Sequence, residues 1–285
     1  MYHFSRTNIP SFLVLAMAYF ATNIPSILVL AMAYFALRIM VTLLRGTLQL
    51  EKTLPAPSFT YRRGLKSLTE CVGFGFDPIT NDYKVVRIVE IFEDDDYYRY
   101  ECTKAQIYNL STDSWREINA VVPDISHFHC FEPFLNGSFH WSASYFVGDG
   151  DSVDDKDFIL SFHMSTEVFQ KMGFPYVCSI GDGKYRSLGV LNESLALILY
   201  DYSAVETKNF DIWVMTEYGV SESWTKQFTI GPLSGVPCPL SIWKNNELLL
   251  EASNGQLVSC NLKTQDIKEY EICGVQTTLR GSCLQ

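Results

Sequence analysis

The sequence has few basic residues and no cluster of them. Lys and Arg number 22 against 32 Asp and Glu, which gives a formal net charge of -10 for the 285 residues. A surface of this charge repels a phosphate backbone, and no local Lys/Arg patch offsets the repulsion. We therefore expect no nucleic-acid partner.

Paired cysteines are also missing. The eight cysteines stand singly, without a CxxC pair and without regular spacing. Structural zinc sites and disulfide scaffolds depend on such patterns, whereas single cysteines in a reducing compartment act as small buried hydrophobic residues. The sequence therefore favours a cytoplasmic protein.

Motifs for phosphate binding and nucleophilic catalysis are absent. Gly73 and Gly75 are followed by Pro78 rather than by a third glycine, so they form no phosphate-binding loop. Residues 231–235 lack the G-x-S-x-G spacing of a nucleophile elbow, which predicts that Ser234 is an ordinary turn residue. A sugar-cleaving propeller enzyme would need two carboxylates across a central cleft, and no such pair is identified. We expect no enzyme, no catalytic residue and no cofactor.

Metal ligands do not gather in a usable pattern. His127, His129 and Cys130 have no second cluster that would complete a zinc site. The acidic stretch from Asp149 to Asp157 lacks the register of a calcium-binding loop. No metal site is expected.

Long hydrophobic runs occur only near the amino terminus. Residues Thr7–Ala21 recur almost unchanged as Thr22–Ala36. Each copy holds an apolar run that as a helix would be about 16 Å long, roughly half of a hydrocarbon core. The second copy continues to Leu44 and is a borderline membrane-spanning candidate, and Arg6 before a short apolar run also allows a signal peptide. Residues 11–44 are therefore a possible membrane-associated segment. Alternatively, residues 1–50 are an abnormal, helical start joined to a normal domain.

The rest of the chain has the composition of many short strands. From Cys71 onward, runs rich in Val, Ile, Phe, Tyr and Trp alternate with Asn, Asp, Gly, Ser and Thr. Four segments predict hairpins whose starts lie roughly 50 residues apart, a spacing typical of kelch blades. These segments are Ala105–Ile118, Ile159–Phe169, Phe210–Trp224 and Leu257–Tyr270.

A turn and an apolar strand precede three of the four predicted hairpins. These turn-strand segments are Leu135–Trp141, Val190–Leu197 and Trp243–Leu250. Their recurrence in the same order predicts an all-β, kelch-like β-propeller. The landmarks amount to about three complete blades and a partial one beginning near Leu54, so the propeller is expected to be incomplete.

One segment connects this pattern to a known family. Residues 71–87, CVGFGFDPITNDYKVVR, resemble the signature of the plant F-box-associated domain, and IYNLSTDSWREI, NGSFHW and FDIWVM follow in the family's order. The resemblance runs from about Leu54 to Tyr270 and is nearest to S-locus F-box proteins. It implies a domain that binds a protein to be ubiquitinated, which for S-locus members is a self-incompatibility ribonuclease.

The same resemblance implies an amino-terminal F-box that docks a cullin ligase adaptor. No F-box is found before Leu54, where the duplicated segment stands, so adaptor docking remains open. The expected parts are the atypical segment 1–50, a propeller-like domain 54–273 and a tail 274–285. The alternatives are a membrane-anchored β domain and a non-functional truncated product.

Two groups of residues receive specific roles. Gly73 and Gly75 are expected to let a strand approach its neighbour closely. Two acidic stretches, residues 90–101 and 149–157, are either solvated loops or fields that attract a basic protein. Tyrosines near them suit an interface, although they can also pack locally. The candidate partner-binding residues are Asp94, Asp95, Asp96, Tyr97, Tyr98, Tyr145, Asp149, Asp151, Asp154 and Asp155.

Overall fold

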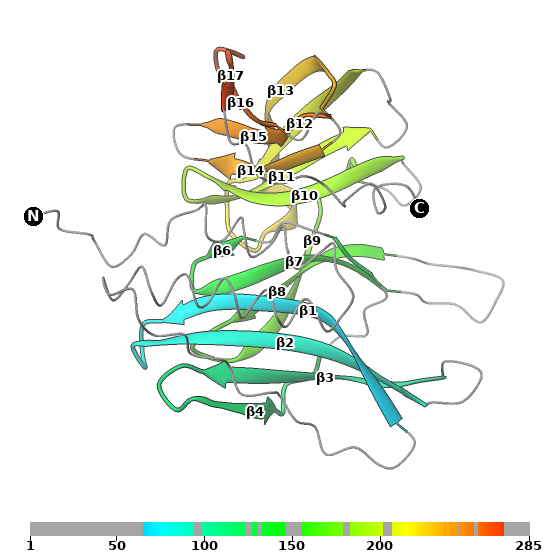
Figure 1. Cartoon of the computed structure of the whole chain (residues 1–285), viewed down its shortest axis with the longest axis vertical. Helices are drawn as coiled ribbons and strands as arrows, with labels where there is room; N and C mark the ends of the chain where they lie inside the picture. Colours follow the sequence, from blue (N-terminus) through cyan, green and yellow to red (C-terminus); the bar gives the residue numbers. More distant parts are fainter. Residues whose placement is uncertain are drawn as a thin grey trace, which may run out of the picture.

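A computed structural model describes most of the chain after residue 64. The described ranges are 65–93, 99–122, 127–129, 133–145, 156–178, 183–201, 207–236, 238–243, 246–253 and 256–270. They form antiparallel sheets and one short 3-10 helix (Figure 1). The segment 1–50, predicted to be helical, lies outside these ranges. Within them, no helix is long and apolar enough to cross a membrane.

Four sheets follow one another along the chain. The first sheet contains β1 (Leu65–Asp77), β2 (Asp82–Glu93), β3 (Arg99–Asn109) and β4 (Ser114–Ile118). The second contains β5 (His127–His129), β6 (Phe134–Leu135), β7 (Ser138–Tyr145), β8 (Lys156–His163) and β9 (Val168–Gly173). The third contains β10 (Lys184–Leu191), β11 (Ser194–Asp201), β12 (Thr207–Met215) and β13 (Trp224–Ser234), with η1 (Ser221–Ser223) before β13. The fourth contains β14 (Cys238–Trp243), β15 (Glu247–Glu251), β16 (Leu257–Asn261) and β17 (Ile267–Tyr270).

Within each sheet the strands are hydrogen-bonded in chain order, and both β5 and β6 pair with β7. Connections therefore alternate between two ends of every sheet. We call the end with the first-to-second and third-to-fourth connections the turn end. We call the end with the second-to-third connections and the links to the next sheet the loop end.

Asparagine determines the turns between the first and second strands. Asn81, Asn136, Asn192 and Asn246 occupy this turn in the four successive sheets, with φ between 49° and 60°. Asn tolerates the left-handed region better than other non-glycine residues because its short side chain can hydrogen-bond locally. The turn that the sequence predicted before an apolar strand therefore has the same left-handed asparagine in each of the four sheets.

The predicted strand pattern is confirmed. Every predicted hairpin is a third-to-fourth strand pair, and in the first of them Ala105 pairs with Ile118 across β3 and β4. The arrangement of four blade-like sheets confirms the all-β, propeller-like fold. The blade expected to be partial is instead a complete four-stranded sheet, because Leu65–Asp77 and Asp82–Glu93 form a long hairpin that was not counted as a turn-strand unit.

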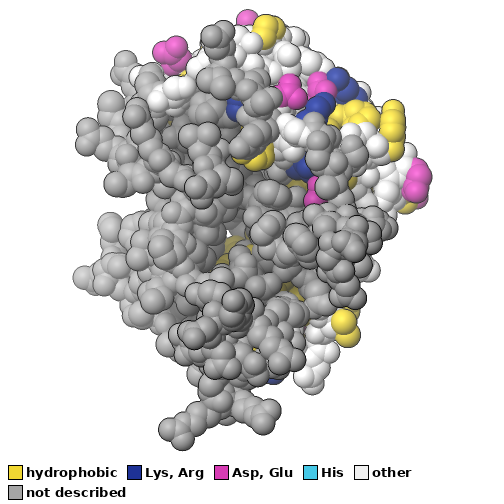
Figure 2. All heavy atoms as spheres, turned by 90° about the vertical axis from the view of Figure 1, so that its right-hand side faces the viewer, with side chains coloured by type: hydrophobic (Ala, Val, Ile, Leu, Met, Phe, Trp, Pro, Cys, Tyr) yellow, Lys and Arg dark blue, Asp and Glu magenta, His cyan; other side chains and the backbone are white. Residues whose placement is uncertain are grey.

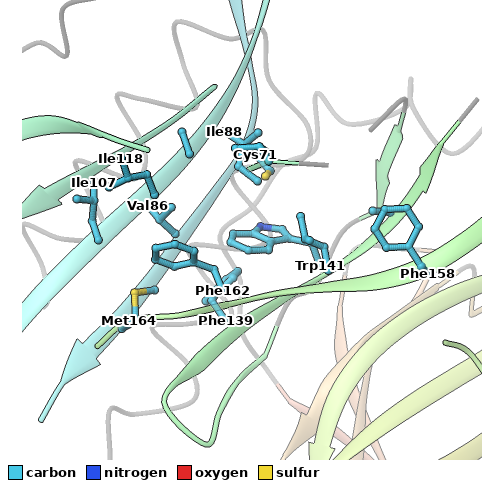
Figure 3. Close-up of a cluster of buried hydrophobic side chains, with 14 residues drawn as sticks. Cys71, Val86, Ile88, Ile107, Ile118, Phe139, Trp141, Phe158, Phe162 and Met164 are labelled. Atoms are coloured by element: carbon cyan, nitrogen blue, oxygen red, sulfur yellow. The ribbon is translucent and has the colours of Figure 1, made fainter. Parts of the chain in front are cut away.

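Three hydrophobic cores hold neighbouring sheets together. The first lies between the first and second sheets, where Val86 and Ile88 meet Phe139, Trp141 and Phe162 (Figure 3). A second core joins the second and third sheets, and a third core joins the third and fourth. Each fully buried large apolar side chain contributes roughly 1.5–3 kcal/mol, so these cores dominate the stability of the stack.

Glycine permits the close approach that the sequence predicted. A Cβ atom at Gly73 would lie 2.6 Å from Trp141 Cζ2 and 2.9 Å from Val86 Cγ1. A Cβ atom at Gly75 would collide with the ring of Phe134 and with Met164. Because Gly73 and Gly75 have no side chains, the second sheet packs directly against the backbone of β1 at these two positions.

Candidate protein-interaction surface

The turn ends of neighbouring sheets coincide. Lys84, at the start of β2, donates a hydrogen bond of 2.8 Å to the carbonyl of Met164 in the turn between β8 and β9. Tyr218, between β12 and β13, lies with its hydroxyl 2.8 Å from Nε2 of His140 near the start of β7. Since each contact joins two turn ends, the loop ends of these sheets also face one way.

This geometry brings the boundaries of the two acidic segments to the same end. Residues 94–98 connect β2 to β3, where Glu93 pairs with Arg99. Residues 146–155 connect β7 to β8, where Tyr145 pairs with Lys156. Figure 1 shows the adjoining ends of these four strands directed to one side.

Among the predicted partner-binding residues, only Tyr145 falls within the described chain, as the last residue of β7. The others lie outside the described residues: Asp94, Asp95, Asp96, Tyr97, Tyr98, Asp149, Asp151, Asp154 and Asp155. Asp157, at the end of the second acidic stretch, forms an ion pair of 3.1 Å with Arg186 of β10. That carboxylate therefore links the second and third sheets.

Two exposed apolar side chains also belong to the loop end. Val121 lies in the link from the first to the second sheet and Tyr176 in the link from the second to the third, and each is 90% exposed. The amide of Cys178 donates to the carbonyl of Pro175, which closes a turn around Tyr176. Sequence reasoning missed both residues, although Pro175 before Tyr176 is a turn signal.

The side chain of Tyr176 contacts a neighbouring ring although most of its surface is exposed to solvent. Its ring meets the ring of Trp213 edge to face, with centroids 6.3 Å apart and planes at 88°. Trp213 itself is only 8% exposed. Figure 2 shows the molecule from the loop end, with acidic, basic and hydrophobic side chains among the described residues at its margin. The described part of this surface is thus of mixed character.

The turn end contains a buried ionic network instead. Lys84 lies 2.8 Å from Asp77 and 3.0 Å from Glu167. Burial by itself raises the pKa of Asp77, but hydrogen bonds from Lys84, Ser165 and Thr80 outweigh it and hold this pKa well below its usual range. Burial also acts to raise the pKa of Glu167. The cations Arg116 and Lys84 outweigh this effect of burial, so the pKa of Glu167 is lowered. The charged groups of this network pair with one another, Lys84 with Asp77 and Glu167, and Arg116 with Glu167. This pairing indicates a structural role.

A second buried polar pair joins the second and third sheets. His140 is fully buried, and Nδ1 lies 3.0 Å from the carbonyl of Pro133. Because that carbonyl can only accept, Nδ1 carries the proton and Nε2 accepts from the Tyr218 hydroxyl. Burial lowers the pKa of His140 to about 4, against the opposing hydrogen bond to Pro133. The neutral imidazole fits this environment, and no reactive group lies beside it in the contacts described.

Within the described ranges, no group of three or more His, Cys, Asp and Glu side chains is arranged to hold a metal ion. His127 and His129 lie on β5, while Cys130 is outside the described residues.

Comparison with known proteins agrees with the architecture. A family model described as the F-box associated beta propeller domain matches residues 57–281. The F-box protein CPR1 of Arabidopsis thaliana is 29% identical over 221 residues, which cover 70% of this chain and 51% of CPR1. The F-box/kelch-repeat protein At3g23880 of the same plant is 30% identical over 203 residues, which cover 67% of this chain and 50% of that protein.

The matched region contains every strand of the four sheets. The chain spans about half the length of the curated relatives it matches. The match of the family model over residues 57–281 includes the signature strand β1, the hairpins and the turn asparagines described above. This chain therefore belongs to the F-box-associated β-propeller family.

Proposed function

We propose that this chain is a non-enzymatic recognition module that binds a basic protein at its loop end. The observation that supports the proposal is the convergence of two acidic segments at one end of neighbouring sheets. An acidic surface attracts a basic partner and steers its approach. Exposed Val121 and Tyr176 at the same end supply apolar contacts of the kind that anchor interfaces.

Family membership extends the proposal to ubiquitin ligases. The relatives are named F-box proteins, so we propose that the bound protein is a target for ubiquitination in a cytoplasmic ligase of the SCF type. A basic self-incompatibility ribonuclease is the specific target class that the chain's net charge of -10 suits. Adaptor binding is a separate property that the recognition surface does not require.

The proposal is tested with two variants. One variant loses acidic charges at the loop end, and a control variant loses acidic charges at the turn end. The loop-end variant replaces the three aspartates at 94–96 by Asn. The control variant removes three exposed charges at the turn end, with Glu193→Gln, Glu217→Gln and Glu222→Gln. Both variants have the same net charge, so only the position of the charges differs.

A purified basic self-incompatibility ribonuclease is the probe, and binding is followed by biolayer interferometry at several salt concentrations. We expect the loop-end variant to bind about tenfold more weakly, mainly through slower association, and the control to bind like the wild type. Equal weakening in both variants would show that general charge, and not the loop end, drives binding. Absence of binding by the wild type would rule out this target class.

Adaptor docking is tested in plant extract. The chain and a version fused to an intact F-box are used as baits, and the cullin ligase adaptor is detected in the recovered material. Recovery with both baits would give the chain a docking surface of its own. Recovery with the fusion alone would mean that the chain recognises targets without recruiting the ligase.

A further inference from the structure

A polar site on the second sheet is filled by a side chain that comes from the third sheet. Ser138 and His140 lie on β7, and Ser161 lies on β8, where it pairs with His140 across the two strands. These three side chains are at most 5% exposed. Tyr218, in the turn between β12 and β13, reaches them with its hydroxyl group. The groups that form the site and the group that occupies it therefore belong to different sheets.

The three polar groups of the site are complementary to a phenol. Nε2 of His140 accepts a hydrogen bond of 2.8 Å from the Tyr218 hydroxyl. The hydroxyls of Ser138 and Ser161 donate to the same phenolic oxygen. The imidazole and phenol rings meet edge to face, with centroids 5.7 Å apart and planes at 90°. Because a neutral phenol donates one proton and accepts through two lone pairs, it satisfies all three groups at once.

The second sheet alone holds the site in shape. The backbone amide and Nδ1 of His140 both donate to the carbonyl of Pro133, at 3.1 and 3.0 Å. These two bonds fix the imidazole ring and leave Nε2 as the acceptor. Ser138 and Ser161 are positioned by the pairing of β7 with β8. Removal of the phenol should therefore leave the site formed, with its buried polar groups in need of a new partner.

The occupant of the site is carried on a separate, exposed turn, residues 216–223, which we call the strap. The strap is closed by its own hydrogen bond of 3.3 Å, from the amide of Thr216 to the carbonyl of Ser223. Tyr218 is 37% exposed, although its hydroxyl reaches buried groups. A Cβ atom at the neighbouring Gly219 would meet no other group within 4 Å. The mouth of the site is therefore at the surface of the turn end, beside Tyr218.

We propose that this part of the second sheet is a binding site for a neutral phenol, with Tyr218 as its internal occupant. An external phenol of the size of a tyrosine side chain binds there when the ring of Tyr218 is absent. A ring without a hydroxyl binds poorly, because it leaves Nε2 of His140 and Oγ of Ser138 buried without the hydrogen bond described for them. The site lies at the turn end, so this inference is independent of the proposed binding at the loop end.

The test uses the full chain with Tyr218→Ala and the probe p-cresol, which is the tyrosine side chain without its backbone. Thermal unfolding measures binding, because a ligand of the folded state raises Tm. We expect p-cresol to raise the Tm of this variant and to bind at least about tenfold more tightly than toluene, which has the same ring and methyl group without the hydroxyl. Tyr176→Ala is the matched control, because that side chain is 90% exposed and its removal opens no enclosed site. The Tm of the control should respond to p-cresol as the wild type does.

Tyr218→Phe provides a second measurement, because it keeps the ring and removes only the hydroxyl. NMR of isotope-labelled histidine rings follows Nε2 of His140, whose signal is assigned by its absence in His140→Asn. The signal should move in Tyr218→Phe to that of an acceptor without a donor, and p-cresol should not restore it because the ring still fills the site.

Two results would overturn the proposal. An unchanged Nε2 signal in Tyr218→Phe would show that the phenol hydroxyl is not the donor to His140. Equal affinity of Tyr218→Ala for p-cresol and toluene, or no binding of either, would show that the second sheet does not select a phenol.

Discussion

Lys84 of β2 and Asp77, the last residue of β1, form a 2.8 Å ion pair whose side chains are only 3% and 1% exposed. The same ammonium group donates to the carbonyl of Met164 and lies 3.0 Å from Glu167. Since residues 164 and 167 belong to the turn between β8 and β9, one lysine ties the first sheet to the second. The pair is therefore a tertiary contact as well as part of a local turn.

Removal of the lysine should destabilise the fold strongly. Lys84→Met leaves the buried Asp77 carboxylate without its counter-charge, which costs about 3–5 kcal/mol. Lys104→Met breaks an exposed pair with Glu117 and should cost less than about 1 kcal/mol. Urea unfolding of both variants measures the difference. Equal free energies of unfolding would show that the Lys84 pair is not essential to the packing of the sheets.

A methyl group at Gly73 should separate the first two sheets. Gly73→Ala places a Cβ atom 2.6 Å from Trp141 Cζ2, and such overpacking costs about 1–3 kcal/mol. Gly189→Ala is the control, because its Cβ atom would lie 3.6 Å from Ile242, an ordinary contact. Thermal unfolding should show a lower Tm for the first variant only. A Tm unchanged at Gly73 would contradict the close approach of β1 to the second sheet.

Acid should weaken the fold through His140 before the carboxylates protonate. The pKa of His140 is about 4 in the folded chain, against 6.5 for a solvated histidine. Between these values the unfolded state binds a proton that the folded state excludes, so stability is complete above about pH 6.5 and falls toward pH 4. The loss approaches about 3 kcal/mol at the lower limit.

The test follows the free energy of unfolding between about pH 6.5 and 5, where Asp77 and Glu167 remain ionised. The variant His140→Asn retains an amide donor for the Pro133 carbonyl but cannot titrate. It should be less stable at neutral pH and should show a flatter pH dependence in this window. A slope equal to that of the wild type would assign the acid sensitivity to other groups.

The exposed tyrosine of the loop end should contribute to binding and little to stability. Tyr176→Ser removes a side chain that is 90% exposed, so the free energy of unfolding should change by less than about 0.5 kcal/mol. Binding of the basic ribonuclease should weaken by more than about 1 kcal/mol if Tyr176 is an anchor. Ile79→Ser, at the turn end, is the control for loss of an exposed apolar group. Unchanged affinity for Tyr176→Ser would exclude this residue from the interface.

Local chemistry explains why much of the fold was predictable. The turn at Asn136 and the hairpin Ala105–Ile118 depend on neighbours in sequence: a left-handed residue, polar turn side chains and alternation of apolar positions. The same signals recur in every sheet, so the repeated strands and the propeller-like class followed from them. The first sheet was counted as partial because its long hairpin lacks the landmark used for the others.

The sequence by itself therefore determined the strands, their turns, the acidic segments and the glycine positions of β1. Only the tertiary structure decided that Lys84 is buried, that His140 meets Tyr218, and that Val121 and Tyr176 share an end with the acidic segments. These relationships join residues of different sheets, and their energies come from desolvation and packing between elements far apart in the chain. Periodicity reports which face of a strand is apolar, whereas the neighbouring sheet determines what that face contacts.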